Sequence, residues 1–453
     1  MEALRILTGA CRLRRSLPAL FALGTLLGLT ASAEQRPTSS ATLLLAALPD
    51  EDGLAELLWE HSADFADDRA RIAASRADHQ RAHLLPNPEL DVSMNTLPLG
   101  DTNPPGLRRL GDVPNYVVGL SERVELGKRG PRQDAAKAAL AATTLEVHAA
   151  LRARTYDVLE RAADVASTEV RIAELTKLSE DARKLTDLQR ARQQHGDAAG
   201  LDVDRSTLEA QSLETSLGEE QAKLTDALLA CAQLAGVPCE PFGSHERAMS
   251  FLQARLDQAP APAAIEARPD LRALGAQEES ARSSLTLARR RWIPDPTVRA
   301  GYTRDQFVIA GNQKNSLFVG LSIPLPLFDH GQADAHAASV SARSARTARE
   351  QLAAQAERET DALTRQLRTV QERRQKLHTQ TLPLAEGVVQ RLDAAVKAGG
   401  AALQDLLLAR RTYGELVLHA ADLDQTAYHL AIAIARASAA GPRAPDTLAA
   451  PRS

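Results

Sequence analysis

Residues 319–322 read Val-Gly-Leu-Ser, and the same four residues stand at positions 118–121. The agreement extends upstream, because Leu-Pro-Asn-Pro at 85–88 corresponds to Ile-Pro-Asp-Pro at 293–296. Three further pairs follow in the same order in both halves: Gly130 with Gly331, Gly196 with Gly399, and Asp202 with Asp405. The chain therefore contains an internal repeat of about 200 residues, and each half is predicted as helix, strand, loop, strand, long helix, turn and helix.

Long helices are predicted wherever proline is missing. Residues 133–237 contain no proline, and apolar residues recur there at steps of three, four or seven, which is typical of a coiled-coil seam. The seam consists of Val158, Ala162, Val165, Ile172, Leu175, Leu178, Ala182, Leu185 and Leu188. The second half repeats this plan with a helical stretch over 332–397, in which Pro383 should cause a kink, and a returning helix over 403–437.

Four short segments alternate apolar with small or polar residues, which predicts strands with one apolar face. Their apolar residues are Leu90, Val92 and Met94; Tyr116, Val118 and Leu120; Val298, Ala300 and Tyr302; and Leu317, Val319, Leu321 and Ile323. A barrel in lipid shows this pattern, and so does a half-buried sheet of a soluble protein. If the strands do lie in lipid, four of them cannot close a barrel alone, so several copies must share one, with 8 strands for two copies or 12 for three.

The N-terminus favours export. Four arginines precede an apolar run at 17–29, and Ala-Ser-Ala at 31–33 suits signal cleavage, so residues 1–33 are predicted to be a signal peptide. The alternative, a first transmembrane helix, needs about 20 apolar residues, more than this run provides. The formal net charge of −4 gives no indication of nucleic acid as a partner.

The remaining segments are predicted from composition and from the repeat. Residues 34–50 form an N-terminal linker, 51–239 the first repeat, 240–267 a linker with an Ala-Pro-Ala-Pro stretch, 268–440 the second repeat, and 441–453 a disordered tail. After signal cleavage, Cys231 and Cys239 are the cysteines that remain, and export permits either a disulfide between them or two free thiols.

In this repeated plan the chain resembles the TolC family of outer-membrane efflux proteins over most of the mature sequence, from about residue 54 to 437. The resemblance rests on Leu-Pro-Asn-Pro-Glu-Leu at 85–90, Arg-Pro-Asp-Leu at 268–271, the run from Val319 to Asp329, Leu-Pro-Leu-Ala-Glu at 382–386 and Asp-Leu-Leu at 405–407. It implies a mainly α-helical fold with a membrane β-barrel, in which a homotrimer builds one 12-stranded barrel and a periplasmic helical tunnel. It also implies a periplasmic adaptor and an inner-membrane pump as partners. The paired prolines before Phe328 resemble most the CzcC branch, which serves divalent-cation pumps.

The resemblance also indicates which residues could matter. The turns at 195–201 and 398–403 would form the periplasmic tip, where an adaptor docks, with Gly196, Gly399 and Gly400 allowing the turns. Asp405, with Asp202 and Asp204 in the first half, would form acidic rings at a gate. Leu408 stands where the family pattern has a second acid, which puts a two-layer ring in doubt. The alternative is that these aspartates are ordinary solvated acids near helix N-termini.

No catalytic motif, phosphate-binding loop or paired-cysteine metal motif is recognisable, so we expect neither an enzyme, a cofactor nor a bound metal. The function expected is the outer-membrane exit duct of a tripartite pump for divalent heavy-metal cations. A drug-efflux or type I secretion channel is the alternative with the same fold. A soluble periplasmic coiled-coil adaptor is the alternative of another class.

Overall fold

The computed structural model describes residues 42–196, 198–257, 265–307, 313–439, 441–445 and 448. The predicted signal peptide at 1–33 and the first part of the N-terminal linker lie outside the described residues, as does most of the predicted tail. The described residues all belong to one compact unit, 41–453.

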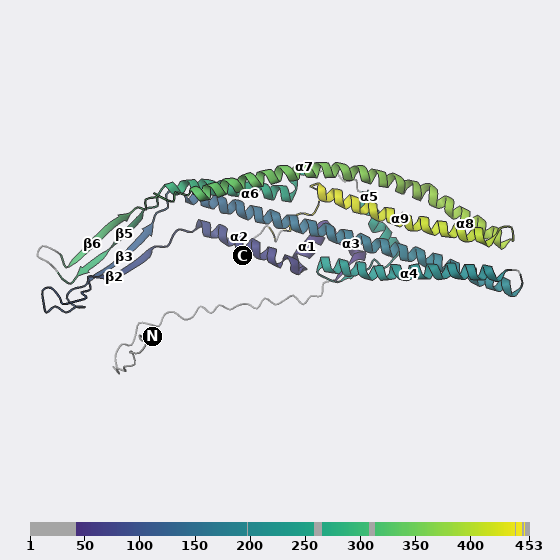
Figure 1. The fold of residues 1–453 in the computed structure, drawn as a ribbon, viewed down its shortest axis with the longest axis horizontal. Coiled ribbons are helices and arrows are strands. Elements are labelled where there is room, and N and C mark those ends of the chain that lie inside the picture. Colours follow the sequence, from purple (N-terminus) through teal and green to yellow (C-terminus); the bar gives the residue numbers. More distant parts are fainter. Residues whose placement is uncertain are drawn as a thin grey trace, which may run out of the picture. The chain divides into compact units, whose positions relative to one another are not determined.

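Four strands form one antiparallel sheet in the order β2, β3, β5, β6 (Figure 1). They are β2 (Glu89–Asn95), β3 (Asn115–Arg123), β5 (Thr297–Asp305) and β6 (Asn315–Ser322). The register places Val118 opposite Tyr302, and Tyr302 opposite Leu317. Because facing residues lie on the same side of a sheet, the predicted apolar residues share one face. This face is uncovered, with Leu317 83% exposed.

The opposite face of the sheet carries a close approach of backbones. Gly119 faces Gly301, and Gly301 faces Phe318 on the next strand. A Cβ on Gly301 would lie 2.5 Å from the backbone oxygen of Val118 and 2.7 Å from Cε1 of Phe318. The two glycines thus leave the space in which the Phe318 ring packs across the strands.

Two helical hairpins extend from the sheet, one in each half. The first contains α3 (Arg129–Gln194), which is about 100 Å long, and α4 (Gly200–Ala235). The second contains α7 (Gln332–Lys376), α8 (Leu382–Lys397) and α9 (Leu403–Ala437). Shorter helices α2 (Ala66–His83) and α6 (Pro269–Arg289) precede the sheet hairpins and pack on α3. The turns that close both long hairpins lie at the end of the helices away from the sheet (Figure 1).

The kink expected from Pro383 takes the form of a π-helical turn. Residues Leu377–Thr381 form this turn between α7 and α8. Proline has no N–H to donate, and its ring would clash with the carbonyl four residues earlier in a regular α-helix. A wider π-turn just before proline removes that clash and lets the helix continue in a changed direction.

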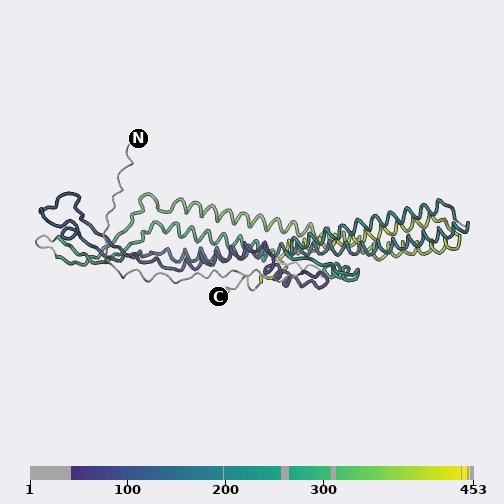
Figure 2. Tube along the Cα trace, turned by 90° about the horizontal axis from the view of Figure 1, so that it is seen from below, coloured from purple at the N-terminus to yellow at the C-terminus, as the bar shows by residue number. Residues whose placement is uncertain are grey.

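The main hydrophobic core surrounds the middle of α3. Helix α1 (Glu51–His61), helix α5 (His245–Asp257) and two short strands, β1 (Leu43–Leu44) and β4 (Cys239–Glu240), pack there. Strands β1 and β4 are parallel, with Leu43 opposite Cys239. Figure 2 shows α1, in purple, beside the long helices. Short 3-10 turns complete the described elements: Leu45–Ala47, Ala63–Phe65, Ile265–Ala267 and Arg290–Trp292.

Two sequence predictions differ from the structure. The linker predicted at 240–267 contains α5, which buries Ala248 and Leu252 in the main core. The alanines and prolines that suggested a linker occupy only 259–262, outside the described residues. In the tail predicted to be disordered, Leu448 is 1% exposed, and its backbone oxygen accepts a hydrogen bond of 2.8 Å from Arg76. A single leucine that fills a core site gives no signal in composition.

Across the described residues, every helix is too short or too polar to cross a membrane.

Candidate functional site

The end of the helices away from the sheet is built from two similar turns. Helix α3 ends at Gln194, and Gly196 takes a left-handed φ of +80°. Helix α8 ends at Lys397, and Gly399 takes the corresponding φ of +77°. An L side chain is strained in this conformation, so both glycines have the turn role predicted for them. Gly400 serves the second turn differently, because its N–H donates to the oxygen of Ala395 at 2.8 Å.

The three predicted aspartates follow these turns. Asp202 lies in the first turn of α4 and Asp405 in the first turn of α9, each three residues after an extended alanine cap. Their backbone N–H groups bond to Ala199 at 3.0 Å and to Ala402 at 3.2 Å. The Asp202 carboxylate lies 4.0 Å from Arg205, whereas Asp204 and Asp405 are exposed. The helix dipole favours an acid at such positions, whatever its further role.

A small hydrophobic cluster joins the two hairpins near these turns. Leu185 of α3 packs with three residues of the second hairpin, Val396, Leu403 and Leu406. Leu406 is fully buried and directly follows Asp405. The second turn is therefore anchored on α3, while Asp405 itself stays on the solvent side.

A polar contact, which sequence reasoning missed, strengthens this junction. Arg410 of α9 donates to the backbone oxygen of Asp181 on α3 at 3.1 Å and to Asp393 on α8 at 3.0 Å. Lys397 also contacts Asp393, at 2.6 Å. Burial would raise the pKa of the Asp393 carboxyl, but the hydrogen bond from Lys397 and the charges of Lys397 and Arg410 outweigh it, so the pKa lies below its usual range.

A cavity of about 340 Å³ lies next to this contact, between α3, α4, α8 and α9. Leu178, Leu213 and Val389 form part of its apolar wall, and Arg410 and Tyr413 part of its polar wall. Helix α9 comes close to α3 at Gly414, where a Cβ would lie 3.0 Å from Cδ1 of Leu178. The hairpins thus touch at particular side chains and leave space between them.

A buried acid lies beside the π-turn. Asp424 on α9 is 2% exposed, and its carboxylate accepts a hydrogen bond from Nε of Arg374, one of two arginines in the last turn of α7. His378, within the π-turn, places Nε2 3.3 Å from the same carboxylate. The Asp424 carboxylate of α9 therefore binds both the end of α7 and the π-turn that precedes Pro383.

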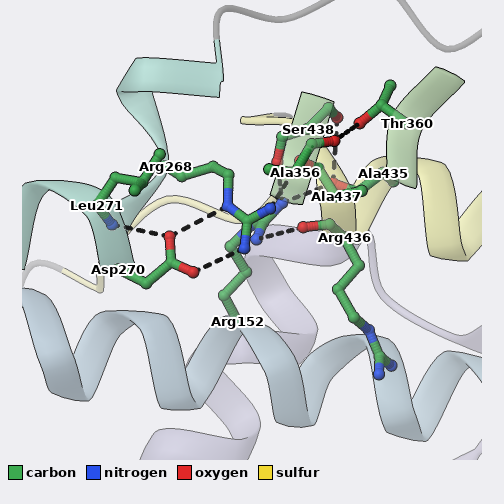
Figure 3. Close-up of polar contacts among 10 residues, drawn as sticks. All are labelled: Arg152, Arg268, Asp270, Leu271, Ala356, Thr360, Ala435, Arg436, Ala437 and Ser438. Carbon is green, nitrogen blue, oxygen red and sulfur yellow. Dashed lines mark hydrogen bonds and ion pairs between the residues drawn. The ribbon is translucent and has the colours of Figure 1, made fainter. Parts of the chain in front are cut away.

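Two arginines, the buried Arg152 and the partly buried Arg268, hold the C-terminal end of α9 (Figure 3). Arg152 of α3 donates to the backbone oxygens of Ala435 and Ser438, both at 2.6 Å. Arg268 donates to the oxygen of Ala437 at 2.8 Å and pairs with Asp270 at 2.7 Å. These contacts satisfy carbonyls that a helix C-terminus leaves without intrahelical partners.

Cys231 and Cys239 are bonded to each other, with an S–S distance of 2.05 Å. The bond joins the end of α4 to β4 across the turn at Gly236, whose φ is +73°. The carboxylate of Glu169 on α3 accepts backbone N–H groups of Phe242 at 2.7 Å and Gly243 at 3.1 Å. The segment that follows α4 is thereby fixed on the main core.

Within the part of the chain that the structure describes, there is no cluster of three or more His, Cys, Asp or Glu residues that could hold a metal ion. The described residues form two long helical hairpins and a sheet with one uncovered apolar face.

Comparison with known proteins finds a matching family model, relatives in sequence and solved structures of the same fold. Residues 261–438 match the family model "Outer membrane efflux protein". The cobalt-zinc-cadmium resistance protein CzcC of Cupriavidus metallidurans is 27% identical over 342 residues, which is 73% of this chain and 76% of that protein. The nickel and cobalt resistance protein CnrC of the same organism is 27% identical over 290 residues, 59% of this chain and 62% of that protein. The pyoverdine export outer membrane protein OpmQ of Pseudomonas aeruginosa is 27% identical over 306 residues, 63% of this chain and 62% of that protein.

Among solved structures, the outer membrane protein VceC of Vibrio cholerae matches with a TM-score of 0.67 and 20% identity, over 86% of this chain and 96% of that chain. Sheet, hairpins and sequence together are those of an outer-membrane efflux channel. Over residues 261–438 the chain matches the outer membrane efflux protein family, the TolC-like channels, and it is similar to CzcC among their members.

Proposed function

We propose that this channel is the exit duct of a tripartite pump that exports divalent heavy-metal cations. The observation that carries the proposal is the similarity to two metal-resistance proteins, of which CzcC matches over about three quarters of both chains. The channel would be passive, and the partner pump would supply the energy and choose the cargo.

Three copies of the chain would build the working channel. The sheet has two open edges, β2 and β6, and its apolar face is exposed. Unpaired strand edges are not tolerated in lipid, so β6 of one copy would pair with β2 of the next. Three copies would close a barrel of 12 strands, an even number that barrels use. Channels of this family are trimers that work with an adaptor and an inner-membrane pump, which supports this assembly.

The turns at the far end of the hairpins would form the periplasmic entrance. Gly196, Gly399 and Gly400 would shape the surface where an adaptor docks. Asp405 would form a three-fold acidic ring, with Asp202 and Asp204 nearby from the other turn. Such rings favour cations. If Asp405 has this role, Asp405→Asn should lower the cation preference of single channels in planar bilayers, and the neighbouring exposed Gln404→Ala should not. Equal selectivity in both variants would remove Asp405 from the gate.

The export function is tested in a deletion strain that carries the gene or its variants on a plasmid. Minimal inhibitory concentrations are measured for zinc, cobalt, cadmium, nickel and copper, and for a panel of dyes and antibiotics. We expect sensitivity confined to metals, restored by the wild-type gene. Normal metal tolerance in the deletion strain, with sensitivity to dyes or antibiotics, would contradict the cation assignment.

A second candidate cargo follows from OpmQ, which is described as a pyoverdine exporter and is as similar in identity as CzcC. The chain would then export a siderophore or drug through the same channel. Siderophore secreted by the same deletion strain, measured beside the inhibitory concentrations, separates the two, because loss of siderophore secretion with normal metal tolerance would favour this second function.

A further inference from the structure

Two histidines stand four positions apart at the end of α2. They are His79 and His83, and the helix ends at His83. Side chains four residues apart lie on the same face of a helix, and here the ring centroids are 4.8 Å apart. His83 is exposed and His79 half-buried, so solvent reaches both residues. The same spacing lets two histidines of one helix bind a single Zn²⁺ in known metal sites.

The hydrogen bonding of His83 leaves its other ring nitrogen available to a ligand. Nδ1 of His83 lies 2.9 Å from the backbone oxygen of His79. A carbonyl oxygen can only accept, so Nδ1 carries the proton. The neutral imidazole then has its lone pair on Nε2, which is the form in which histidine binds a metal. A hydrogen bond of this kind also fixes the orientation of the ring.

The distance between the two rings suits one ion held by both. Imidazole nitrogens bind Zn²⁺ at about 2.0–2.1 Å, and two rings that share an ion at this distance have centroids about 5 Å apart. The observed 4.8 Å agrees with that value. Within the described ranges, no third His, Cys, Asp or Glu joins the pair as a possible ligand. Water would therefore complete the coordination.

The charges around the pair act on a bound cation in opposite directions. The C-terminal end of a helix carries the negative end of its dipole, which favours a cation beside these histidines. Arg81 lies in the same turn and pairs with Asp78 at 2.9 Å. Arg129 donates to the backbone oxygen of His83 at 3.1 Å and so fixes the end of the helix. The two guanidinium groups lower the affinity for a cation, so we expect an ion that exchanges readily.

We propose that His79 and His83 together chelate one divalent transition-metal ion. Imidazole suits Cu²⁺, Ni²⁺ and Zn²⁺, whereas Mg²⁺ and Ca²⁺ require oxygen ligands. The inference goes beyond the proposed function, because a passive duct needs no site that retains its cargo. It revises the sequence-based expectation that the chain binds no metal.

The test uses Ni²⁺, titrated by calorimetry into the purified full-length protein, which carries an affinity tag without histidine. At neutral pH we expect one ion per chain to bind more tightly than any other, and no binding of Mg²⁺. His79→Ala and His83→Ala should each lower the nickel affinity about tenfold or more, since even the loss of a ligand's supporting hydrogen bond has an effect of that size. His419→Ala, at an exposed position on α9, should leave the affinity unchanged.

Two further variants separate chelation from binding by isolated histidines. If both imidazoles hold the same ion, the double variant His79→Ala, His83→Ala should lose no more binding than either single variant. Gln80→His in the His83→Ala background keeps the number of histidines but places them at adjacent positions, which do not face each other on a helix. This variant should not regain the nickel site. Circular dichroism checks that each variant is folded.

Equal nickel affinity in the wild type and in His83→Ala would overturn the site. Additive losses in the double variant, or recovery with Gln80→His, would show that the histidines do not act as a chelate. These outcomes are independent of the cargo. Normal metal tolerance of the deletion strain would contradict the cation duct and leave the nickel site intact, whereas metal sensitivity without any effect of the histidine variants on nickel binding would keep the duct and remove the site.

Discussion

The Nη2 atom of Arg410 on α9 lies 3.0 Å from Oδ1 of Asp393 on α8. The same guanidinium donates to the backbone oxygen of Asp181 on α3, at 3.1 Å. One side chain thus joins three helices next to the proposed entrance. A channel that opens by separating its hairpins must break this contact or move all three helices together.

Replacing Arg410 should therefore loosen the entrance. Arg410→Ala removes both hydrogen bonds, and single-channel conductance in planar bilayers should rise relative to wild type. Arg411→Ala is the matched control, because Arg411 pairs with Glu415 on the same helix and both side chains are exposed. Equal conductance of the two variants would show that the contact does not hold the hairpins.

The contact should depend on pH in the acid range only. The folded-state pKa of Asp393 lies below its ordinary value of 3.8, so its stabilising effect is complete above that value and is lost as pH falls through the folded pKa. Conductance should stay constant from pH 7 to pH 5 and rise below pH 3.8. In Asp393→Asn this acid-induced rise should vanish. A rise that persists in that variant would assign the pH response to other groups.

Loss of the acid beside the π-turn should destabilise the helical domain. Asp424→Asn leaves the charge of Arg374 without its partner, and removal of one member of a buried pair costs about 3 kcal/mol. The thermal midpoint of the helical circular dichroism signal should fall by about 5 °C. Asp361→Asn, at an exposed site on α7, should leave the midpoint unchanged. An unchanged midpoint in Asp424→Asn would mean that the π-turn is held by packing alone.

The repeated plan could be predicted from the sequence because its signals are periodic and local. Alternation at 317–323 defines a strand face, and proline-free stretches define the helices. Gly196 and Gly399 mark the turns because only glycine adopts their φ at no cost. These features depend on the backbone and on residues a few positions apart.

Contacts between distant parts of the chain could not be predicted in this way. Arg152 on α3 contacts the end of α9, which lies almost 300 positions later in the sequence. Asp424 on α9 contacts Arg374 on α7, 50 positions earlier. An arginine in a heptad pattern gives no sign that it will be buried. The Asp393–Lys397 pair, four residues apart on one helix, is the part of the site that sequence spacing could have indicated.

The glycine pair in the sheet provides a further prediction. Gly301→Val would place Cβ 2.5 Å from the backbone oxygen of Val118, a contact that no rotamer relieves. Strand pairing between β3 and β5 should fail, and the heat-modifiable shift in gel mobility that marks folded outer-membrane proteins should disappear. Gly320→Ala should retain the shift, because its Cβ would meet only the flexible Arg299 side chain, at 3.0 Å. Normal heat modifiability of Gly301→Val would show that β3 and β5 pair in another register.

The buried arginine at the end of α9 should matter more for stability than for transport. Arg152→Met removes the charged donors to the backbone oxygens of Ala435 and Ser438, and the loss of these charge-assisted hydrogen bonds costs on the order of 3 kcal/mol together. Methionine replaces much of the aliphatic volume, so the loss reports on hydrogen bonding and not on a cavity. The thermal midpoint should fall, whereas Arg365→Met, at an exposed position on α7, should be neutral. Because Arg152 lies far from the proposed entrance, the conductance of the channels that do fold should equal that of wild type. A changed conductance at an unchanged midpoint would mean that the end of α9 takes part in gating.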